Sequence, residues 1–239
     1  MFDVYWRSQK GDRVPENRDF GGAGIRLDTA LYVIADGSTS RQYSGELAQS
    51  LVHHLVDWFV ESNVEFTAKA LIEQLRKAHT SLSKVFSASS ASYAILHLDQ
   101  AQYSQLIHAG DCLIGRSSGC SPIQWQIKPH TLANAMDDLP IAEIAKKNVR
   151  NRLTRSFRAK EFLAPSIKAI QAEDTSFILA TDGFWADLSE KEQAAFATGQ
   201  KVEITSDSDD KSILCIGEFG PNSKECLFPE DNFYLKKHP

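Results

Sequence analysis

The 239-residue sequence is poor in several features that would narrow its class at once. It has four cysteines, no Cys-x-x-Cys pair and too few thiols for a disulfide scaffold. It also has no excess of lysine and arginine. The formal net charge of -5 provides no electrostatic footprint for nucleic acid or an anionic membrane, so neither partner is expected.

Long apolar runs are absent as well. No stretch approaches the roughly 20 residues that a membrane-spanning helix needs, and the first residues lack the basic region and apolar core of a signal peptide. With the unpaired cysteines, these absences indicate a reduced, cytoplasmic setting. The apolar content of 42% and charged content of 24% are ordinary for a soluble globular protein. The length suits one large domain or two small ones with a sizeable core.

What the sequence does contain is one short pattern that occurs twice. Residues 31–35 are apolar or β-favouring and lead directly into Asp36-Gly37, and residues 177–181 lead into Asp182-Gly183 in the same way. Each copy is typical of a buried strand that ends in a turn, and Asp-Gly after a strand is first of all a turn signal. Two such strands that each deliver a carboxylate to a turn nevertheless suggest carboxylates gathered around a cation.

Hydrophobic periodicity predicts the other elements. Apolar stripes at helical spacing favour two helices, over residues 44–60 and 67–86, and Ser189 with Glu192 forms a capping box for a short third helix. Further strands are expected at residues 2–7, 25–27, 93–98, 103–109, 112–116, 123–127, 162–164, 167–172 and 212–216. Hairpins on either side of two inserted helices argue for antiparallel sheets covered by helices.

Six aspartates lie at expected strand ends or in tight turns: Asp19, Asp36, Asp111, Asp182, Asp209 and Asp210. Carboxylates gathered in one place raise each other's pKa, so such a cluster needs a counter-charge. Oxygen ligands without histidine or cysteine suit Mg²⁺ or Mn²⁺ rather than Zn²⁺. Two such ions a few ångströms apart can clamp a phosphoryl group and lower the pKa of a bridging water.

Seven stretches resemble, in order, the motifs of one family. They are Gly11-x-Arg13 with Asn17-Arg18-Asp19, Val33-Ile-Ala-Asp36-Gly37, Gly45-Glu46-x-Ala48, Ala109-Gly110-Asp111-Cys112, Asn151-x-Leu153-Thr154-Arg155, Leu179-Ala-Thr-Asp182-Gly183-Phe-Trp185 and Asp209-Asp210-x-Ser212. The family is the metal-dependent protein phosphatases of type 2C, also called PPM phosphatases. The resemblance implies a bacterial-like serine/threonine phosphatase acting on phosphoserine or phosphothreonine proteins.

The resemblance also implies an architecture. The fold would be α+β, a four-layer α-β-β-α sandwich in which two antiparallel sheets pack face to face with helices outside. Residues 1–217 would form a single catalytic domain. Residues 218–239 are polar and are interpreted as a C-terminal tail or an embellishment at the edge of the fold.

The metal ligands follow from the same resemblance. Asp36 would bridge two Mn²⁺ or Mg²⁺ ions, the Gly37 carbonyl would be a ligand, and Asp182 and Asp209 would complete the two sites. Asp36 and Asp182 are thus the implied catalytic residues, and a water bridging the ions would attack phosphorus in line. Asp19 would support the metals.

Two more positions complete the implied site. Asp111, together with Asp182, matches the position that holds a third, weaker metal in bacterial members of the family. Arg13 would hold the phosphate of the substrate.

Among the departures of the sequence from the family, one lies in the loop that carries Arg13. An extra residue separates Arg13 from Asn17, and Arg18 stands where an acid or an amide is usual. Arg18 is either a second phosphate contact or a solvated surface residue. These departures favour an alternative, a pseudophosphatase that serves as a regulatory binding module, whereas the intact aspartates favour the enzyme. A hydrolase of nonprotein phosphoesters is a third option.

Overall fold

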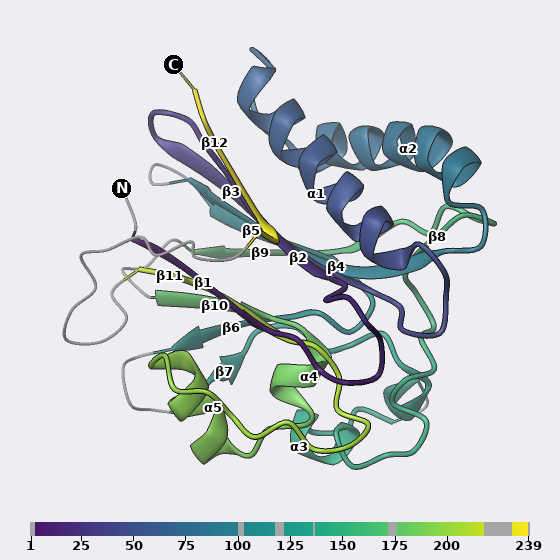
Figure 1. Ribbon diagram of the computed structural model, residues 1–239. Helices are drawn as coiled ribbons and strands as arrows, with labels where there is room; N and C mark the ends of the chain where they lie inside the picture. The colour runs from purple at the N-terminus through teal and green to yellow at the C-terminus, as the bar shows by residue number, and fades with distance from the viewer. Residues whose placement is uncertain are drawn as a thin grey trace.

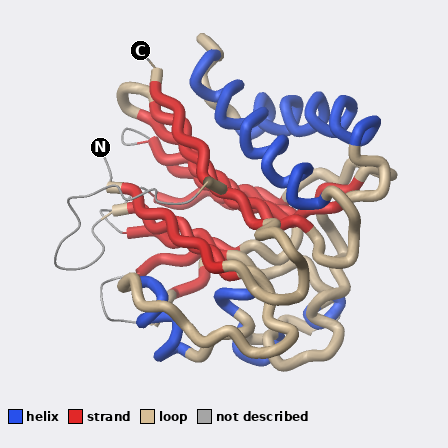
Figure 2. Tube along the Cα trace, viewed as in Figure 1, coloured by secondary structure: helices blue, strands red, loops and turns tan. Residues whose placement is uncertain are grey.

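Two β-sheets lie face to face, with helices on their outer sides (Figures 1 and 2). The computed structural model describes residues 3–99, 103–117, 122–135, 137–171, 176–217 and 231–238. One sheet has the antiparallel order β1 (Val4–Gln9), β11 (Lys211–Ile216), β10 (Ser176–Ala180), β6 (Leu113–Ser117), β7 (Gln124–Trp125). The predicted α+β sandwich of two sheets between helices is confirmed.

The second sheet is larger. Its order is β12 (Phe233–Lys237), β2 (Asp19–Ile25), β3 (Thr29–Gly37), β4 (Ser90–Asp99), β5 (Tyr103–Ala109), β9 (Ser166–Gln171), and β8 (Phe157–Arg158) also pairs with β4. The pair β12–β2 is parallel, and the other pairs are antiparallel. Figure 1 shows α1 (Ser44–Glu61) and α2 (Ala68–Val85) above this sheet. On the far side of the sandwich it shows α3 (Ile141–Ile144), α4 (Asp182–Trp185) and α5 (Glu190–Ala197).

Strand β3 connects the two cores of the sandwich. Side chains alternate along a strand, so Leu31 and Val33 pack against the helices while Tyr32 and Ile34 face the other sheet. All four are buried. Because both faces are covered, the strand is held rigidly up to its last residues, where Asp36 lies.

The two long helices form where periodicity predicts them. The stripe of Leu47, Leu51, Leu55 and Phe59 on α1 is fully buried against the sheet. Helix α2 begins after Thr67, whose hydroxyl accepts a hydrogen bond from the backbone N–H of Ala70 at 3.1 Å, as an N-cap does. Ser189 and Glu192 form the predicted capping box of α5.

The predicted strand at residues 25–27 is wrong in position, because the strand is β2, residues 19–25. Its glycines have low strand propensity, so pattern and propensity both miss it. They are needed for packing, since a Cβ at Gly21 would lie 2.6 Å from the Trp6 ring and one at Gly22 would lie 2.4 Å from Val52. Glycine thus lets the other sheet and α1 approach this strand.

Two other strand predictions also differ from the structure. No strand forms at residues 162–164, where Phe162 instead packs against the core cluster under α2. The strand expected at residues 123–127 shrinks to the two residues of β7. Short apolar runs in connections are ambiguous, because periodicity over three to five residues does not distinguish a strand from a packed loop.

The C-terminal residues form an edge strand. In β12, Tyr234 stacks on His53 of α1 at a centroid distance of 4.1 Å. Just before it, the side-chain amide of Asn232 donates to the Asp19 carbonyl and to Ser8 Oγ, both at 2.9 Å. Residues 218–230 of the expected tail lie outside the described residues. No helix in the described part of the chain is long and apolar enough to span a bilayer.

Candidate active site

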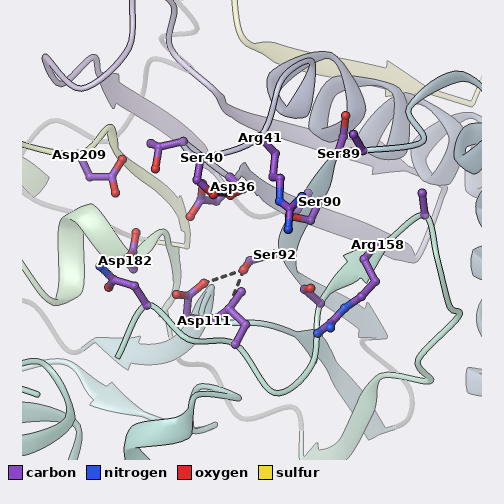
Figure 3. Close-up of a pocket in the computed structure, with 18 of the residues that line it drawn as sticks. Asp36, Ser40, Arg41, Ser89, Ser90, Ser92, Asp111, Arg158, Asp182 and Asp209 are labelled. Atoms are coloured by element: carbon purple, nitrogen blue, oxygen red, sulfur yellow. Dashed lines mark hydrogen bonds between the residues drawn. The ribbon is translucent and has the colours of Figure 1, made fainter. Parts of the chain in front are cut away.

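A cleft of about 580 Å³ opens where strands from both sheets end, and four of the six aspartates line it (Figure 3). Asp36 lies near the end of β3, and Asp111 lies in the turn between β5 and β6. Asp182 begins α4, two residues after the end of β10. Asp209 lies two residues before the start of β11. The fold therefore brings together carboxylates that are up to 173 residues apart in the sequence (209 − 36 = 173).

The glycine that follows each aspartate of the repeated pattern is required by close backbone packing. A Cβ at Gly37 would lie 2.3 Å from the carbonyl oxygen of Ser44, at the start of α1. A Cβ at Gly183 would lie 2.0 Å from the carbonyl oxygen of Asp210. Each Asp-Gly pair is thus locked against a second segment of chain, which holds its carboxylate at the cleft.

Burial and mutual repulsion disfavour the charged forms of these acids. Burial, followed by the charge of Asp182, raises the pKa of Asp111 to about 7 from an ordinary value of 3.8. Burial, followed by Asp209, raises the pKa of Asp182 to about 6. The pKa of Asp36 is raised well above its ordinary value by burial and by the charges of its acidic neighbours.

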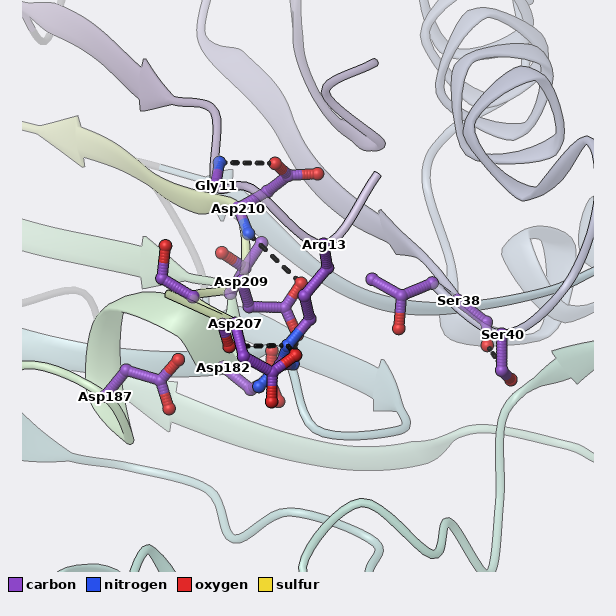
Figure 4. A network of polar contacts seen from close by, with 12 residues as sticks. Gly11, Arg13, Ser38, Ser40, Asp182, Asp187, Asp207, Asp209 and Asp210 are labelled. Carbon is purple, nitrogen blue, oxygen red and sulfur yellow. Dashed lines mark hydrogen bonds and ion pairs between the residues drawn. The ribbon is translucent and has the colours of Figure 1, made fainter. Parts of the chain in front are cut away.

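Two arginines supply part of the missing positive charge. Arg150 donates from Nη1 to Asp182 at 2.9 Å and from Nη2 to Asp187 at 2.6 Å. Arg13, the predicted phosphate ligand, pairs with Asp209, and its Nε donates to the Asp207 carbonyl at 2.9 Å (Figure 4). Arg13 thus lies at the cleft with its guanidinium engaged by an aspartate.

Asp210 has a structural position rather than one in the cleft. It accepts hydrogen bonds from the backbone N–H groups of Gly11 and Arg18, both at 2.8 Å (Figure 4 shows the first). Its carboxylate therefore ties the 11–18 segment to the start of β11. Of the acidic pair at residues 209–210, only Asp209 lines the cleft.

Asp19 lies behind the cleft, opposite Asp36 in the β2–β3 ladder. It is 2% exposed and accepts a hydrogen bond from Thr181 Oγ1 at 2.9 Å. Burial raises the pKa of Asp19 well above its ordinary value, and the charge of Asp210 adds to the shift. This placement gives Asp19 contact with the residue that directly precedes Asp182, so it links the two copies of the Asp-Gly pattern across the sheets.

Arg18 is neither a solvated residue nor directed at the cleft. Its side chain is 11% exposed. Its Nη1 donates to the backbone carbonyls of Ser38, Thr39 and Arg41 at 2.9, 3.2 and 2.8 Å. Both alternatives from the sequence are wrong for Arg18, which instead fixes the loop that follows Asp36-Gly37.

The donor set of the cleft fits a divalent cation. The side chains are hard oxygen donors, and their raised pKa values reflect a shortage of positive charge. Within the described ranges, no three His, Cys, Asp or Glu side chains already form a group that could hold an ion. Asp182 and Asp209 are turned toward arginines instead. Chemistry and placement fit the metal, and side-chain rotation has to complete the ligand set.

Two residues of the site were not predicted from the sequence. Ser92 Oγ donates to Asp111 at 2.6 Å from the neighbouring strand β4 (Figure 3). Arg150 directly precedes Asn151, the first residue of a motif that resembles the family, and this adjacency could have indicated that Arg150 lies near the site. Ser92 had none, because a serine within a strand carries no sign of what it faces.

Comparisons with known proteins identify the fold. Neither family models nor curated protein sequences give a match. Solved structures do match, among them the serine/threonine phosphatase Stp1 from Staphylococcus aureus, with TM-score 0.76, 13% identity and coverage of 92% of this chain and 96% of that one. The PPM Ser-Thr phosphatase MsPP from Mycobacterium smegmatis, solved in complex with cacodylate, has TM-score 0.74 and 16% identity, covering 91% and 98%. The chain thus has the fold of PPM-type serine/threonine phosphatases.

Proposed function

We propose that this chain is a metal-dependent phosphatase that hydrolyses phosphoserine and phosphothreonine in proteins. One observation carries the proposal: Asp36, Asp111, Asp182 and Asp209 come from four separate segments and line a single cleft. They do so in a fold that PPM phosphatases share. A structural role alone does not require four acids whose charged forms are disfavoured by burial.

The chain's own groups have distinct tasks in this proposal. Asp36, Asp182, Asp209 and the Gly37 carbonyl would hold two Mn²⁺ or Mg²⁺ ions, with Asp19 in support and Asp111 with Asp182 at a third, weaker site. When bound, such ions would supply positive charge against the phosphoryl oxygens and lower the pKa of the attacking water, so that it is deprotonated near neutral pH. Arg13 would orient the substrate phosphate through its two-pronged guanidinium. To do so, Arg13 has to release Asp209.

A second candidate function rests on the arginines. Because Arg13 and Arg150 already neutralise Asp209 and Asp182, a fold without metal is electrostatically tolerable. This favours a pseudophosphatase that binds phosphoproteins without turnover. A hydrolase of nonprotein phosphoesters is the remaining alternative, and a panel of small phosphoesters beside phosphopeptides separates it from the first proposal.

Hydrolysis of a phosphothreonine peptide with Mn²⁺, with chelator, and by Asp182→Asn tests the proposal. We expect turnover that requires Mn²⁺ and is lost in Asp182→Asn. Asp138→Asn is a matched control, since Asp138 is an exposed partner of Lys128 that does not line the cleft. Correctly folded protein that hydrolyses no phosphopeptide at any Mn²⁺ concentration contradicts the proposal, and if it hydrolyses no small phosphoester either, the result supports the binding module.

A further inference from the structure

The cleft is divided by charge. The four aspartates gather on one side, whereas Arg41 and Arg158 lie on the other (Figure 3). Lys160 also lines the cleft. Among the residues that the structure describes, the lining contains no acidic residue besides the four aspartates, so the charged side chains of the second side are all cationic. The assignment of Asp36, Asp111, Asp182 and Asp209 to metal binding uses only one of these two sides.

The three cations of the second side are unpaired, in contrast to the arginines of the acidic side. Arg13 and Arg150 each hold an aspartate. Over the described ranges of the chain, the side chains of Arg41, Arg158 and Lys160 form no ion pair or hydrogen bond. Cationic side chains that face a cleft without a partner are available to an anionic ligand.

Arg158 provides a second, independent observation. Its Nε is buried and has no hydrogen-bond partner in the described part of the chain, although a buried donor without a partner costs free energy. The Nε atoms of Arg7 and Arg26 are also buried and unbonded, but these guanidiniums lie over Phe196 and Phe59. No such ring contact is found for Arg158 among the described residues, so nothing compensates its buried Nε.

The backbones of Arg158 and Arg41 are fixed by hydrogen bonds. Arg158 pairs with Ser90 in the β4–β8 ladder, and its carbonyl lies 3.0 Å from His79 Nε2. The carbonyl of Arg41 accepts the 2.8 Å hydrogen bond from Arg18 described above. Binding to cations on fixed backbones loses little conformational entropy, and this favours a built subsite over a mobile surface.

Most of the remaining lining between the two sides is polar and small. Hydroxyl groups predominate, among them those of Ser38, Ser40, Ser89 and Ser90. Guanidinium and hydroxyl donors recognise carboxylates and phosphates. A volume of about 580 Å³ is within the roughly 300–1,000 Å³ typical of sites for whole ligands, so it accepts more than one phosphoryl group.

We infer that Arg41, Arg158 and Lys160 form a subsite for a second anionic group of the substrate, beside the phosphate to be removed. The inference rests on the proposed phosphatase function and specifies its substrate class: phosphoproteins whose phosphorylated residue is flanked by acidic side chains or by another phosphate. A carboxylate and a second phosphate share the chemistry that this subsite recognises.

The test compares four phosphothreonine peptides that differ only in flanking residues: glutamine, glutamate, a second phosphoserine, or lysine. With Mn²⁺, we expect kcat/KM roughly tenfold higher for the glutamate and doubly phosphorylated peptides than for the glutamine peptide, and lowest for lysine. High salt reduces the preference. If only the second phosphate raises kcat/KM, the subsite recognises phosphate. If glutamate raises it as well, the subsite accepts carboxylates and phosphates alike.

The variant Arg158→Gln/Lys160→Gln is expected to reduce this preference to about twofold or less. Lys191→Gln, which removes an exposed cation on α5, is the matched control and keeps the preference. Thermal melting confirms that both variants are folded. Equal kcat/KM for the glutamine, glutamate and doubly phosphorylated peptides, or a preference that survives the double substitution, overturns the subsite.

Equilibrium binding separates this inference from the phosphatase proposal. Fluorescence anisotropy of the labelled peptides in chelator measures affinity without turnover. If no peptide is hydrolysed but the double substitution abolishes the affinity difference, the phosphatase proposal fails and the anion subsite stands. If peptides are hydrolysed while affinities and rates ignore the flanking charge, the phosphatase stands and the subsite fails.

Discussion

The two Asp-Gly turns are alike in sequence but differ in their surroundings. Asp36-Gly37 closes β3, and no arginine bonds the Asp36 side chain among the described residues. Asp182-Gly183 begins α4, and Arg150 holds Asp182. Burial and neighbouring carboxylates raise the pKa of both acids, but the Arg150 charge limits the rise for Asp182.

This difference separates two kinds of information. The repeated pattern identifies two strands that each deliver a carboxylate to one cleft, and the structure brings both there. The charge that compensates each carboxylate depends on distant residues. Asp36 therefore has the greater need for an added cation. Asp182 already has the Arg150 guanidinium, which has to move away from Asp182 or share it with a metal ion.

The largest expected effect is on turnover. We expect both Asp36→Asn and Asp182→Asn to lower kcat/KM for a phosphothreonine peptide about a hundredfold or more, because each removes a ligand charge. Excess Mn²⁺ should restore more activity to Asp182→Asn than to Asp36→Asn, because only Asp36 is assigned to both ions. Equal rescue of the two variants contradicts the assigned asymmetry, and Asp138→Asn again serves as the control.

Removing Arg150 tests the compensated side. In chelator, Arg150→Met leaves Asp182 buried without its cation, and we expect the free energy of unfolding to fall by about 2 kcal/mol, limited because Asp182 can take up a proton. Mn²⁺ should recover part of this loss. Chemical denaturation measures it, with Arg152→Met as the control for an exposed neighbouring arginine. Equal stability of the two variants removes the compensating role of Arg150.

The glycines of the two turns provide a matched structural test. Gly37→Ala and Gly183→Ala each force a Cβ into a backbone carbonyl, so we expect each to lower the free energy of unfolding by about 1–2 kcal/mol. Gly45→Ala is the control, because its Cβ would meet only the Arg18 residue at 3.3 Å or more. If all three variants have similar melting temperatures, backbone packing does not fix the two turns.

The pH dependence of stability has a defined sign. Folding raises the pKa of Asp111 to about 7 from 3.8. The protonated side chain therefore contributes fully to the free energy of unfolding below pH 3.8, the pKa of the unfolded chain, and this contribution is lost as the pH rises through about 7. In chelator, the free energy of unfolding of Asp111→Asn should therefore increase relative to that of the wild type, by on the order of 1 kcal/mol, between about pH 5 and pH 8. The lowered pKa values of His108 and His130 change the stability in the opposite direction with pH. Because both histidines are present in the variant and in the wild type, their contributions cancel in the difference. A constant difference across this range contradicts the shift.

Much of the architecture follows from local pattern. Long amphipathic helices and apolar strands such as β5 and β10 were predicted within a few residues, because each carries its own periodicity. Strand β2 was misplaced because its glycines are selected by Trp6 and Val52, which are distant in sequence.

The site divides in the same way. The aspartates could be found because each follows a strand in a recognisable motif. The pairs Arg13–Asp209 and Arg150–Asp182 join residues 196 and 32 positions apart, and no local pattern encodes them. The function of Arg18 was missed for the same reason, since its acceptors are backbone carbonyls of another loop.

The most direct test of the central claim is calorimetric titration of the metal-free protein with Mn²⁺, repeated on Asp36→Asn. We expect two ions bound by the wild type, and loss of both sites, or at least a tenfold weakening of each, in Asp36→Asn. Absence of Mn²⁺ binding by the folded wild type, or binding that Asp36→Asn leaves unchanged, would contradict the claim that the two Asp-Gly turns form one metal site.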